Sequence, residues 1–167
     1  SGSWVFYSYG DEHIYWLSPH IWEGLFSFRN GWLIYTPIML FAFVGIPFLR
    51  KIDRPMTWAL SFILPLHVYI VFSWWCWYYG SSLSMRPMID LYPLFAFGIA
   101  AFVRYALSKN ALIYPLIASL FGLLIYNNAL QTKQYDEGLL SGSDMTKGAF
   151  SALCLNTDPP SNLKLLG

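Results

Sequence analysis

The sequence has 167 residues, of which 56% are hydrophobic, 20% are aromatic and only 11% are charged. An ordinary soluble domain carries about 25% charged residues, so this chain has more apolar surface than a soluble fold of its length could bury. The formal net charge is +1, and the ten lysines and arginines are scattered along the chain. Composition and charge therefore exclude a strongly basic nucleic-acid-binding protein and predict a membrane protein.

Residues 1–30 form a first segment that is rich in tyrosine and tryptophan but interrupted by charged residues, histidines and a proline. So polar a stretch cannot cross a bilayer as a helix, whereas tyrosine and tryptophan rings favour the membrane–water interface. We expect an interfacial segment that faces outward. The sequence begins at Ser1, with no initiator methionine and no visible signal peptide, so we expect it to be a piece of a longer protein.

Four largely apolar stretches follow, each close to the roughly 20 residues that a helix needs to cross about 30 Å of hydrocarbon. They cover residues 31–49, 56–75, 87–107 and 111–130. Short connections join them, which favours an antiparallel bundle. We predict an all-α membrane protein with about four transmembrane helices that form part of a larger multi-helix bundle with outward aromatic loops.

The charges of the short connections predict an orientation. Residues 50–54 and 104–109 carry five of the ten lysines and arginines but one of the nine acidic residues. The positive-inside rule therefore assigns both connections to the cytoplasm. Residues 1–30, the aromatic residues 74–84 and the polar tail, residues 131–167, then face outward. Within this tail, Asp144 is a candidate cap for a short helix over residues 145–155.

Arg86 lies at the outward start of the third predicted span, where the positive-inside rule gives no reason for a positive charge. Asp90 follows four residues later on the same face of an α-helix, so a simple ion pair is one explanation. The other adds Arg29, which lies at the outer boundary just before the first span, because two guanidinium groups at one level could bind a phosphate or pyrophosphate. For Arg29 the competing explanation is a side chain that reaches lipid headgroups.

Two carboxylates and two imidazoles belong to the outward opening segment: Glu12, His13, His20 and Glu23. Such groups could act as a general base, contact a sugar or an acceptor, or bind a divalent cation. Their spacing matches no metal motif, so we assign no metal ligands, and a solvated loop is the simpler interpretation. A divalent cation is the one cofactor that the sequence leaves open.

Trp77 and Tyr79 belong to an aromatic run that ends in Gly80-Ser81-Ser82. An interfacial belt of rings explains the run, but the flexible turn after it could let both rings line a groove for a sugar or a lipid. Cys76 and Cys154 both face outward in the predicted topology, which leaves a disulfide open. The sequence has no P-loop, dinucleotide glycine fingerprint, HExxH or GxSxG motif, which disfavours a nucleotide-driven pump or a familiar hydrolase.

The amino-acid sequences of two segments resemble those of a known family. They are LFSxRNGWLxYTP, residues 25–37, and WWxWxYGxSxxxRPMIDxYP, residues 74–93. Both are similar to the C-terminal half of bacterial polytopic membrane glycosyltransferases of the protein-mannosyltransferase and aminoarabinose-transferase type. The resemblance implies the GT-C fold of family 39-like enzymes, the bacterial inner membrane, and a site that faces the periplasm or exterior.

The resemblance also implies an activity and its partners. Such enzymes move a sugar from a polyprenyl-phosphate donor to a lipid, glycan or protein acceptor, and we expect Arg29 and Arg86 to bind the lipid phosphate while Asp90 orients Arg86. The family's catalytic aspartate lies in an outward loop nearer the N-terminus than this sequence reaches. We therefore expect the chain to be inactive without that N-terminal half. The alternative is a non-enzymatic membrane module, either a transporter subunit or an assembly partner.

Overall fold

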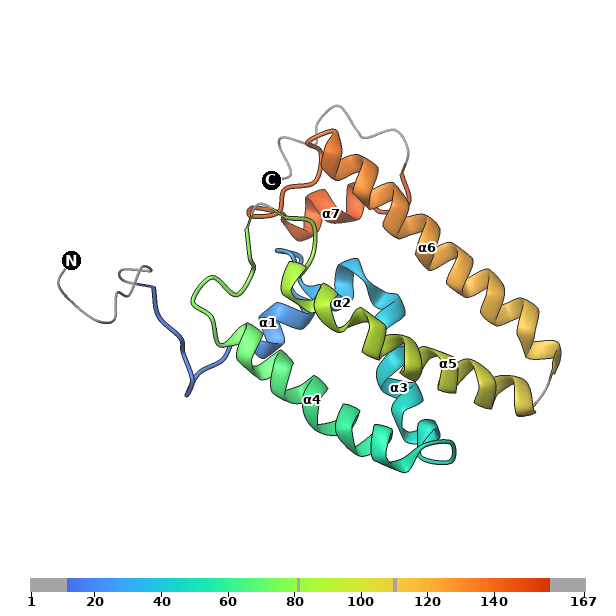
Figure 1. Ribbon diagram of the computed structural model, residues 1–167. Coiled ribbons are helices and arrows are strands. Elements are labelled where there is room, and N and C mark those ends of the chain that lie inside the picture. Colours follow the sequence, from blue (N-terminus) through green and yellow to red (C-terminus); the bar gives the residue numbers. More distant parts are fainter. Residues whose placement is uncertain (1–11, 81, 110, 157–167) are drawn as a thin grey trace.

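Helices make up the regular structure of the chain in the computed structural model, which describes residues 12–80, 82–109 and 111–156 (Figure 1). No strand occurs within these ranges, although Ile14 and Trp74 form an isolated antiparallel bridge. The prediction of an all-α fold is confirmed. In chain order the elements are α1 (Ile21–Phe26), α2 (Trp32–Tyr35), η1 (Pro37–Met39), α3 (Leu40–Leu49), α4 (Arg54–Phe72), η2 (Arg86–Leu91), α5 (Tyr92–Lys109), η3 (Ala111–Ile113), α6 (Tyr114–Asp136) and α7 (Lys147–Leu153).

Helices α3 and α5 form the closest helix pair, because small residues let their backbones approach. An added Cβ on Gly45 would collide with the carbonyl of Gly98, and one on Gly98 would collide with the carbonyl of Ala42. Small residues at such crossings are typical of membrane helices. The main core continues from this pair to α2 and α4, with Trp32, Phe95 and other buried side chains packed together.

Two helical stretches are long and apolar enough to cross a membrane: Arg54–Phe72, which is α4, and Arg86–Lys109, which combines η2 with α5. Only 33% and 17% of their apolar windows are buried, whereas the core helix of a soluble protein is mostly buried. The prediction of about four spans is therefore corrected to two by length and composition. The predicted second span, residues 56–75, overlaps α4, and the predicted third span, residues 87–107, falls within the stretch Arg86–Lys109.

The first predicted span, residues 31–49, is not one continuous helix. Thr36 leaves the helical conformation, with a φ of −128° and a ψ of 62°, and separates α2 from the helical stretch Pro37–Leu49. At 1.5 Å per residue this stretch is about 20 Å long, which is shorter than a hydrocarbon core of about 30 Å. The proline after Thr36 disfavours a helical conformation at the preceding residue, which explains the break.

The fourth predicted span, residues 111–130, forms most of α6, which continues to Asp136. Helix α6 is long, but it does not combine length with sufficient hydropathy to count among the two candidate spans. Amides on its C-terminal half are used for packing: Asn128 Nδ2 donates to the carbonyl of Tyr35 at 3.2 Å, and Gln134 Nε2 donates to that of Leu153 at 2.9 Å. These amide side chains lower the apolar character of α6, and their hydrogen bonds fasten it to α2 and to the segment after α6.

The described part of the tail that follows α6, residues 139–156, folds back and forms a second small core, in which Tyr35, Leu140, Met145, Ala149 and Leu153 are buried together. Its helix α7 begins after Thr146, whose Oγ1 accepts a hydrogen bond from the Ala149 backbone N–H at 3.2 Å. Asp144 is therefore not the cap that the sequence predicted. Helix α7 thus begins two residues later than predicted. Met145, the first residue of the predicted helix, is buried in the second core and has a non-helical backbone.

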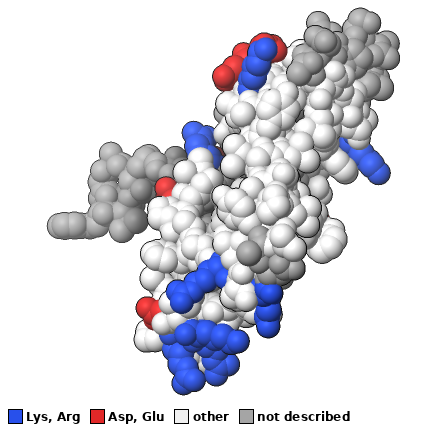
Figure 2. Space-filling view, turned by 90° about the vertical axis from the view of Figure 1, so that its right-hand side faces the viewer, with Lys and Arg blue, Asp and Glu red and all other residues white. Residues whose placement is uncertain are grey.

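The molecule has two distinct ends (Figure 1). The turn between α3 and α4 lies at the same end as the last turn of α5 and the first turn of α6, while residues 74–80, residues 82–84 and α7 lie at the other end. Figure 2 shows a dense group of basic side chains at the lower end of the face that it draws and a largely uncharged middle. The two basic connections that the sequence predicted to share one side of the membrane thus share one end of the fold.

Candidate functional site

A tight turn, residues 27–31, carries Arg29 and Asn30 to the end of the molecule opposite the basic connections. Asn30 has a φ of 66°, a left-handed conformation that asparagine adopts more readily than most residues. Its buried side chain donates from Nδ2 to the carbonyl of Tyr78 at 2.7 Å and to that of Ser84 at 3.2 Å. The buried Oδ1 of the same amide has no hydrogen-bond partner. Asn30 therefore fastens the turn to the aromatic residues 74–84.

The side chain of Arg29 lies on Tyr78, with its Cζ 3.8 Å from the centre of the ring. Its Nε donates a hydrogen bond to the backbone carbonyl of Ser143, and the residue is half-buried. Neither Nη atom has a hydrogen-bond or ion-pair partner within the part of the chain that the structure describes. The guanidinium is thus held in position, and a guanidinium with two unused terminal nitrogens is able to donate hydrogen bonds to an anion.

Three segments that are far apart in the sequence meet at this point, which we call the arginine junction: Arg29, Asn30, Tyr78, Ser84 and Ser143. The tail loop reaches the junction because Gly142 lies directly against the backbone of Ser82, where a side chain would collide. Asp144, next to Ser143, is exposed. The junction therefore combines one anchored cation, one ring and several backbone carbonyls.

Arg86 and Asp90 are both exposed and form no ion pair with each other. They lie in η2, a 3₁₀ helix with three residues per turn, so residue i+4 is rotated about a third of a turn from residue i. The expected ion pair along one α-helical face is therefore absent. Arg86 follows Ser84 by two residues, and Asn30 binds the Ser84 carbonyl, so the fold brings the segments of Arg29 and Arg86 together although the two side chains share no contact.

The opening segment runs antiparallel along the end of α4. The backbone N–H of Trp75 donates to the carbonyl of His13 at 3.1 Å, and that of His20 donates to the carbonyl of Phe72 at 2.8 Å. The His20 and Trp77 rings then lie 6.1 Å apart between centres. Two of the predicted contact residues are thus neighbours, and a sugar-sized ligand could touch both.

The other predicted residues of the opening segment contribute less to this site. His13 and Glu23 are exposed, and Glu12 is half-buried with an interaction of its own. Asp11 lies outside the described residues. No three histidine, cysteine or acidic side chains of the described ranges gather closely enough to hold a metal ion.

Tyr79 is half-buried, and its side chain contributes to the fold. Its backbone has a φ of 44°, and its hydroxyl donates to the carbonyl of Val71 at 2.9 Å. Burial, with a smaller contribution from Cys76, raises the pKa of Tyr79 to about 12. A hydrogen bond with the Cys76 side chain raises the pKa of Tyr78 above its ordinary value, and the Arg29 guanidinium opposes that shift. Cys76 and Cys154 are both free thiols in the structure.

Two residues of the arginine junction, Asn30 and Ser143, were not predicted from the sequence. The Asn30-Gly31 dipeptide is a turn signal, since asparagine tolerates the left-handed region and glycine adopts it freely, so a turn here was open to prediction. Ser143 had no such signal, because it contributes only its backbone carbonyl.

Comparisons with protein-family models, with curated proteins and with solved structures give no match for this chain.

Proposed function

We propose that this chain is the lipid-phosphate-binding part of a bacterial membrane glycosyltransferase, which transfers a sugar from a polyprenyl-phosphate donor to a lipid, glycan or protein acceptor on the outer face of the inner membrane. The observation that carries the proposal is Arg29, half-buried and stacked on Tyr78, with both Nη atoms unpartnered within the described residues. The resemblance of residues 25–37 and 74–93 to such enzymes supports the same function.

Arg29 suits a phosphate ligand for a physical reason. The guanidinium is planar and always charged, and its fork of N–H groups matches two phosphate oxygens at once. Because Tyr78 and the Ser143 carbonyl already hold the side chain, less rotamer freedom is lost when the phosphate binds. In this proposal Arg86 supplies a second positive charge, and Asp90 orients Arg86 when the donor is bound.

The arginines act on the leaving group. When the bond between the sugar and the lipid phosphate breaks, negative charge develops on the departing phosphate oxygens, and fixed cations stabilise that charge most where water is scarce. The base that activates the acceptor comes from the N-terminal half of the enzyme. His20 and Trp77 form the acceptor or sugar side, and Glu12, His13, Glu23 and Tyr79 are further candidates for acceptor, sugar or cation contacts.

A second candidate function is a non-enzymatic membrane module, either a transporter subunit or an assembly partner. Arg86 favours it, because its side chain is exposed and has no ion pair among the described residues, and such an arginine can simply anchor lipid headgroups. The two functions differ in what Arg29 does, since anchoring requires no particular geometry at the arginine junction.

A transfer assay with a polyprenyl-phosphate sugar distinguishes them. In the full-length protein, Arg29→Ala is expected to lower transfer about 10- to 100-fold, the effect of losing about 1.5–3 kcal/mol from a hydrogen-bonded charge. Arg29→Lys is expected to recover little, because an ammonium group cannot stack and bind two oxygens in the same way. Lys133→Ala is the control, since Lys133 pairs with Glu137 on the exposed surface of α6 at 3.7 Å.

Membrane insertion and thermal stability are measured alongside transfer. Retained insertion with lost transfer in Arg29→Ala supports the enzyme. Wild-type transfer in both Arg29→Ala and Arg86→Ala, or no sugar transfer by the full-length wild-type protein, would overturn it.

A further inference from the structure

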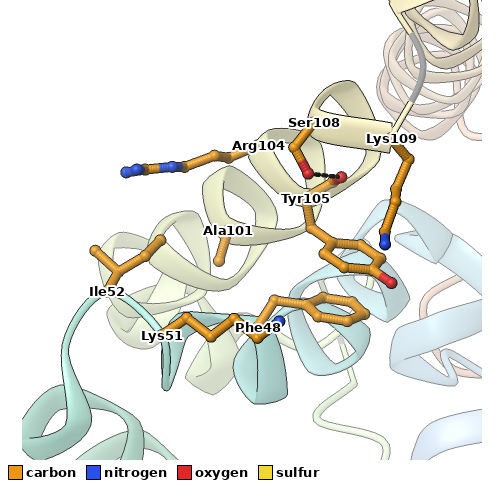
Figure 3. Close-up of a pocket in the computed structure, with 8 residues that line it drawn as sticks. All are labelled: Phe48, Lys51, Ile52, Ala101, Arg104, Tyr105, Ser108 and Lys109. Atoms are coloured by element: carbon orange, nitrogen blue, oxygen red, sulfur yellow. Dashed lines mark hydrogen bonds between the residues drawn. The ribbon is translucent and has the colours of Figure 1, made fainter.

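A pocket of about 260 Å³ lies at the basic end of the molecule, opposite the arginine junction. It is formed by the last turn of α3, the residues just after it, and the last turns of α5 (Figure 3). Two stacked rings form one wall: the centres of Phe48 and Tyr105 are 3.8 Å apart and their planes differ by 7°.

Three cations line the pocket, and no carboxylate does: Lys51, Arg104 and Lys109. Lys109 Nζ lies 5.5 Å from the centre of the Tyr105 ring, and Figure 3 shows Arg104 extending away from Lys109, toward the side of Ile52. None of the three forms an ion pair within the described part of the chain. The nearest carboxylate in sequence, Asp53, is engaged as the cap of α4, where its Oδ1 accepts from the Met56 backbone N–H at 2.9 Å.

A shallow, open apolar groove of about 600 Å³ lies on one side of α5 and shares Arg104 with this pocket. Its lining consists of Ala96, Ile99, Ala100, Val103 and Leu107, together with Arg104. Arg104 therefore belongs both to the groove and to the basic pocket. Since α5 lies in one of the two stretches apolar enough to cross a membrane, the groove runs along a surface suited to hydrocarbon.

We propose that this end of the protein binds an anionic phospholipid, with the phosphate of the headgroup in the basic pocket and an acyl chain along the α5 groove. Basic pockets beside membrane helices attract anionic headgroups, and each cation near the surface contributes favourably. Positive charge at helix C-termini also offsets the helix dipole, but that effect needs neither a concave pocket nor an adjoining groove. The site is separate from the proposed donor site, and its occupant need not react.

The test uses the full-length protein in detergent and measures binding of phosphatidylglycerol by native mass spectrometry, with phosphatidylcholine as the neutral lipid. The pocket variant is Arg104→Gln with Lys109→Gln. Its matched control is Arg50→Gln with Arg54→Gln, which removes the same charge from the same end through two exposed residues outside the pocket. We expect phosphatidylglycerol to bind at least tenfold more weakly to the pocket variant and within twofold of wild type to the control.

A third variant, Ala100→Trp, fills the groove at an exposed position. It is expected to weaken phosphatidylglycerol binding at least fivefold while leaving the weak binding of glycerol phosphate, measured by the same method, unchanged. Equal losses in the pocket variant and in its control would overturn the proposal in favour of general charge attraction. Equal binding of phosphatidylcholine and phosphatidylglycerol, or wild-type lipid binding by Ala100→Trp, would overturn it as well.

Discussion

Asn30 holds the turn of the arginine junction in a backbone conformation that few residues accept. Its φ of 66° lies in the left-handed region, and its buried amide donates to two carbonyls of the aromatic residues 74–84. A buried carbonyl left without a donor costs about 1–3 kcal/mol, and a left-handed conformation costs a non-glycine residue about 1 kcal/mol or more. Asn30 therefore has a strained backbone and a side chain that makes two hydrogen bonds.

Asn30→Ala is expected to lower the free energy of unfolding by about 2–4 kcal/mol, since it removes both hydrogen bonds and keeps the strained backbone. Asn30→Gly is expected to cost about 1 kcal/mol less, because glycine accepts the left-handed conformation. Thermal unfolding in detergent measures both variants. Equal stability of the alanine and glycine variants would show that the φ of Asn30 carries no strain.

At the scale of residues, the sequence indicated Arg29 and Arg86 because charge is scarce in an apolar chain. What it could not predict is the environment of each side chain. Arg29 is held by a ring from the aromatic loop and a carbonyl from the tail, about 50 and 114 residues away in sequence. Arg86 and Asp90 are separated by the geometry of a 3₁₀ helix, whose i, i+4 positions no longer share a face.

At the scale of elements, the packing of α3 against α5 depends on the absence of side chains at their crossing. Gly45, Gly98 and Ala42 let the two backbones touch, whereas Gly122 on α6 has no neighbouring atom within 4 Å of an added Cβ. The same substitution at the two kinds of site should therefore have opposite effects.

Gly98→Ala is expected to destabilise the protein by about 1–3 kcal/mol, because the new methyl group forces α3 and α5 apart. Gly122→Ala is expected to be neutral or to stabilise by up to about 1 kcal/mol through helix propensity alone. Unfolding in detergent, followed by circular dichroism, compares the two. A stable Gly98→Ala protein would mean that α3 and α5 are not in the described contact.

Element boundaries were predictable where composition alone decides them and were wrong where local chemistry intervenes. Helices α4 and α5 were foreseen as apolar stretches between charged ends. The first predicted span was wrong because a lack of charged residues does not reveal the break in the helix at Thr36. The fourth was predicted as a membrane span although α6 carries amide side chains that it uses for packing. The cap of α7 moved from Asp144 to Thr146 because Met145 is needed in the second core.

At the scale of the whole molecule, the distribution of charged side chains and the arrangement of the helices distinguish the same two ends. The exposed Ile52 lies in the connection between α3 and α4 at the basic end, and the exposed Cys154 lies just after α7 at the other end (Figure 1). We expect these ends to lie on opposite sides of the membrane, with the basic end inside.

Labelling with a membrane-impermeable maleimide tests that orientation. In intact cells Cys154 is expected to react in a Cys76→Ser protein, whereas Ile52→Cys in a protein without native cysteines is expected to react only after the membrane is permeabilised. Reaction of both positions in intact cells would exclude this topology.

The binding of a polyprenyl phosphate by the full-length protein, compared with the binding of the same polyprenol without its phosphate, is the most direct measurement of what Arg29 does. The arginine junction predicts that wild type binds the phosphate at least tenfold more tightly than the alcohol and that Arg29→Ala loses this preference while remaining folded. A folded Arg29→Ala protein that keeps the full preference for the phosphate would contradict the proposed function of the junction.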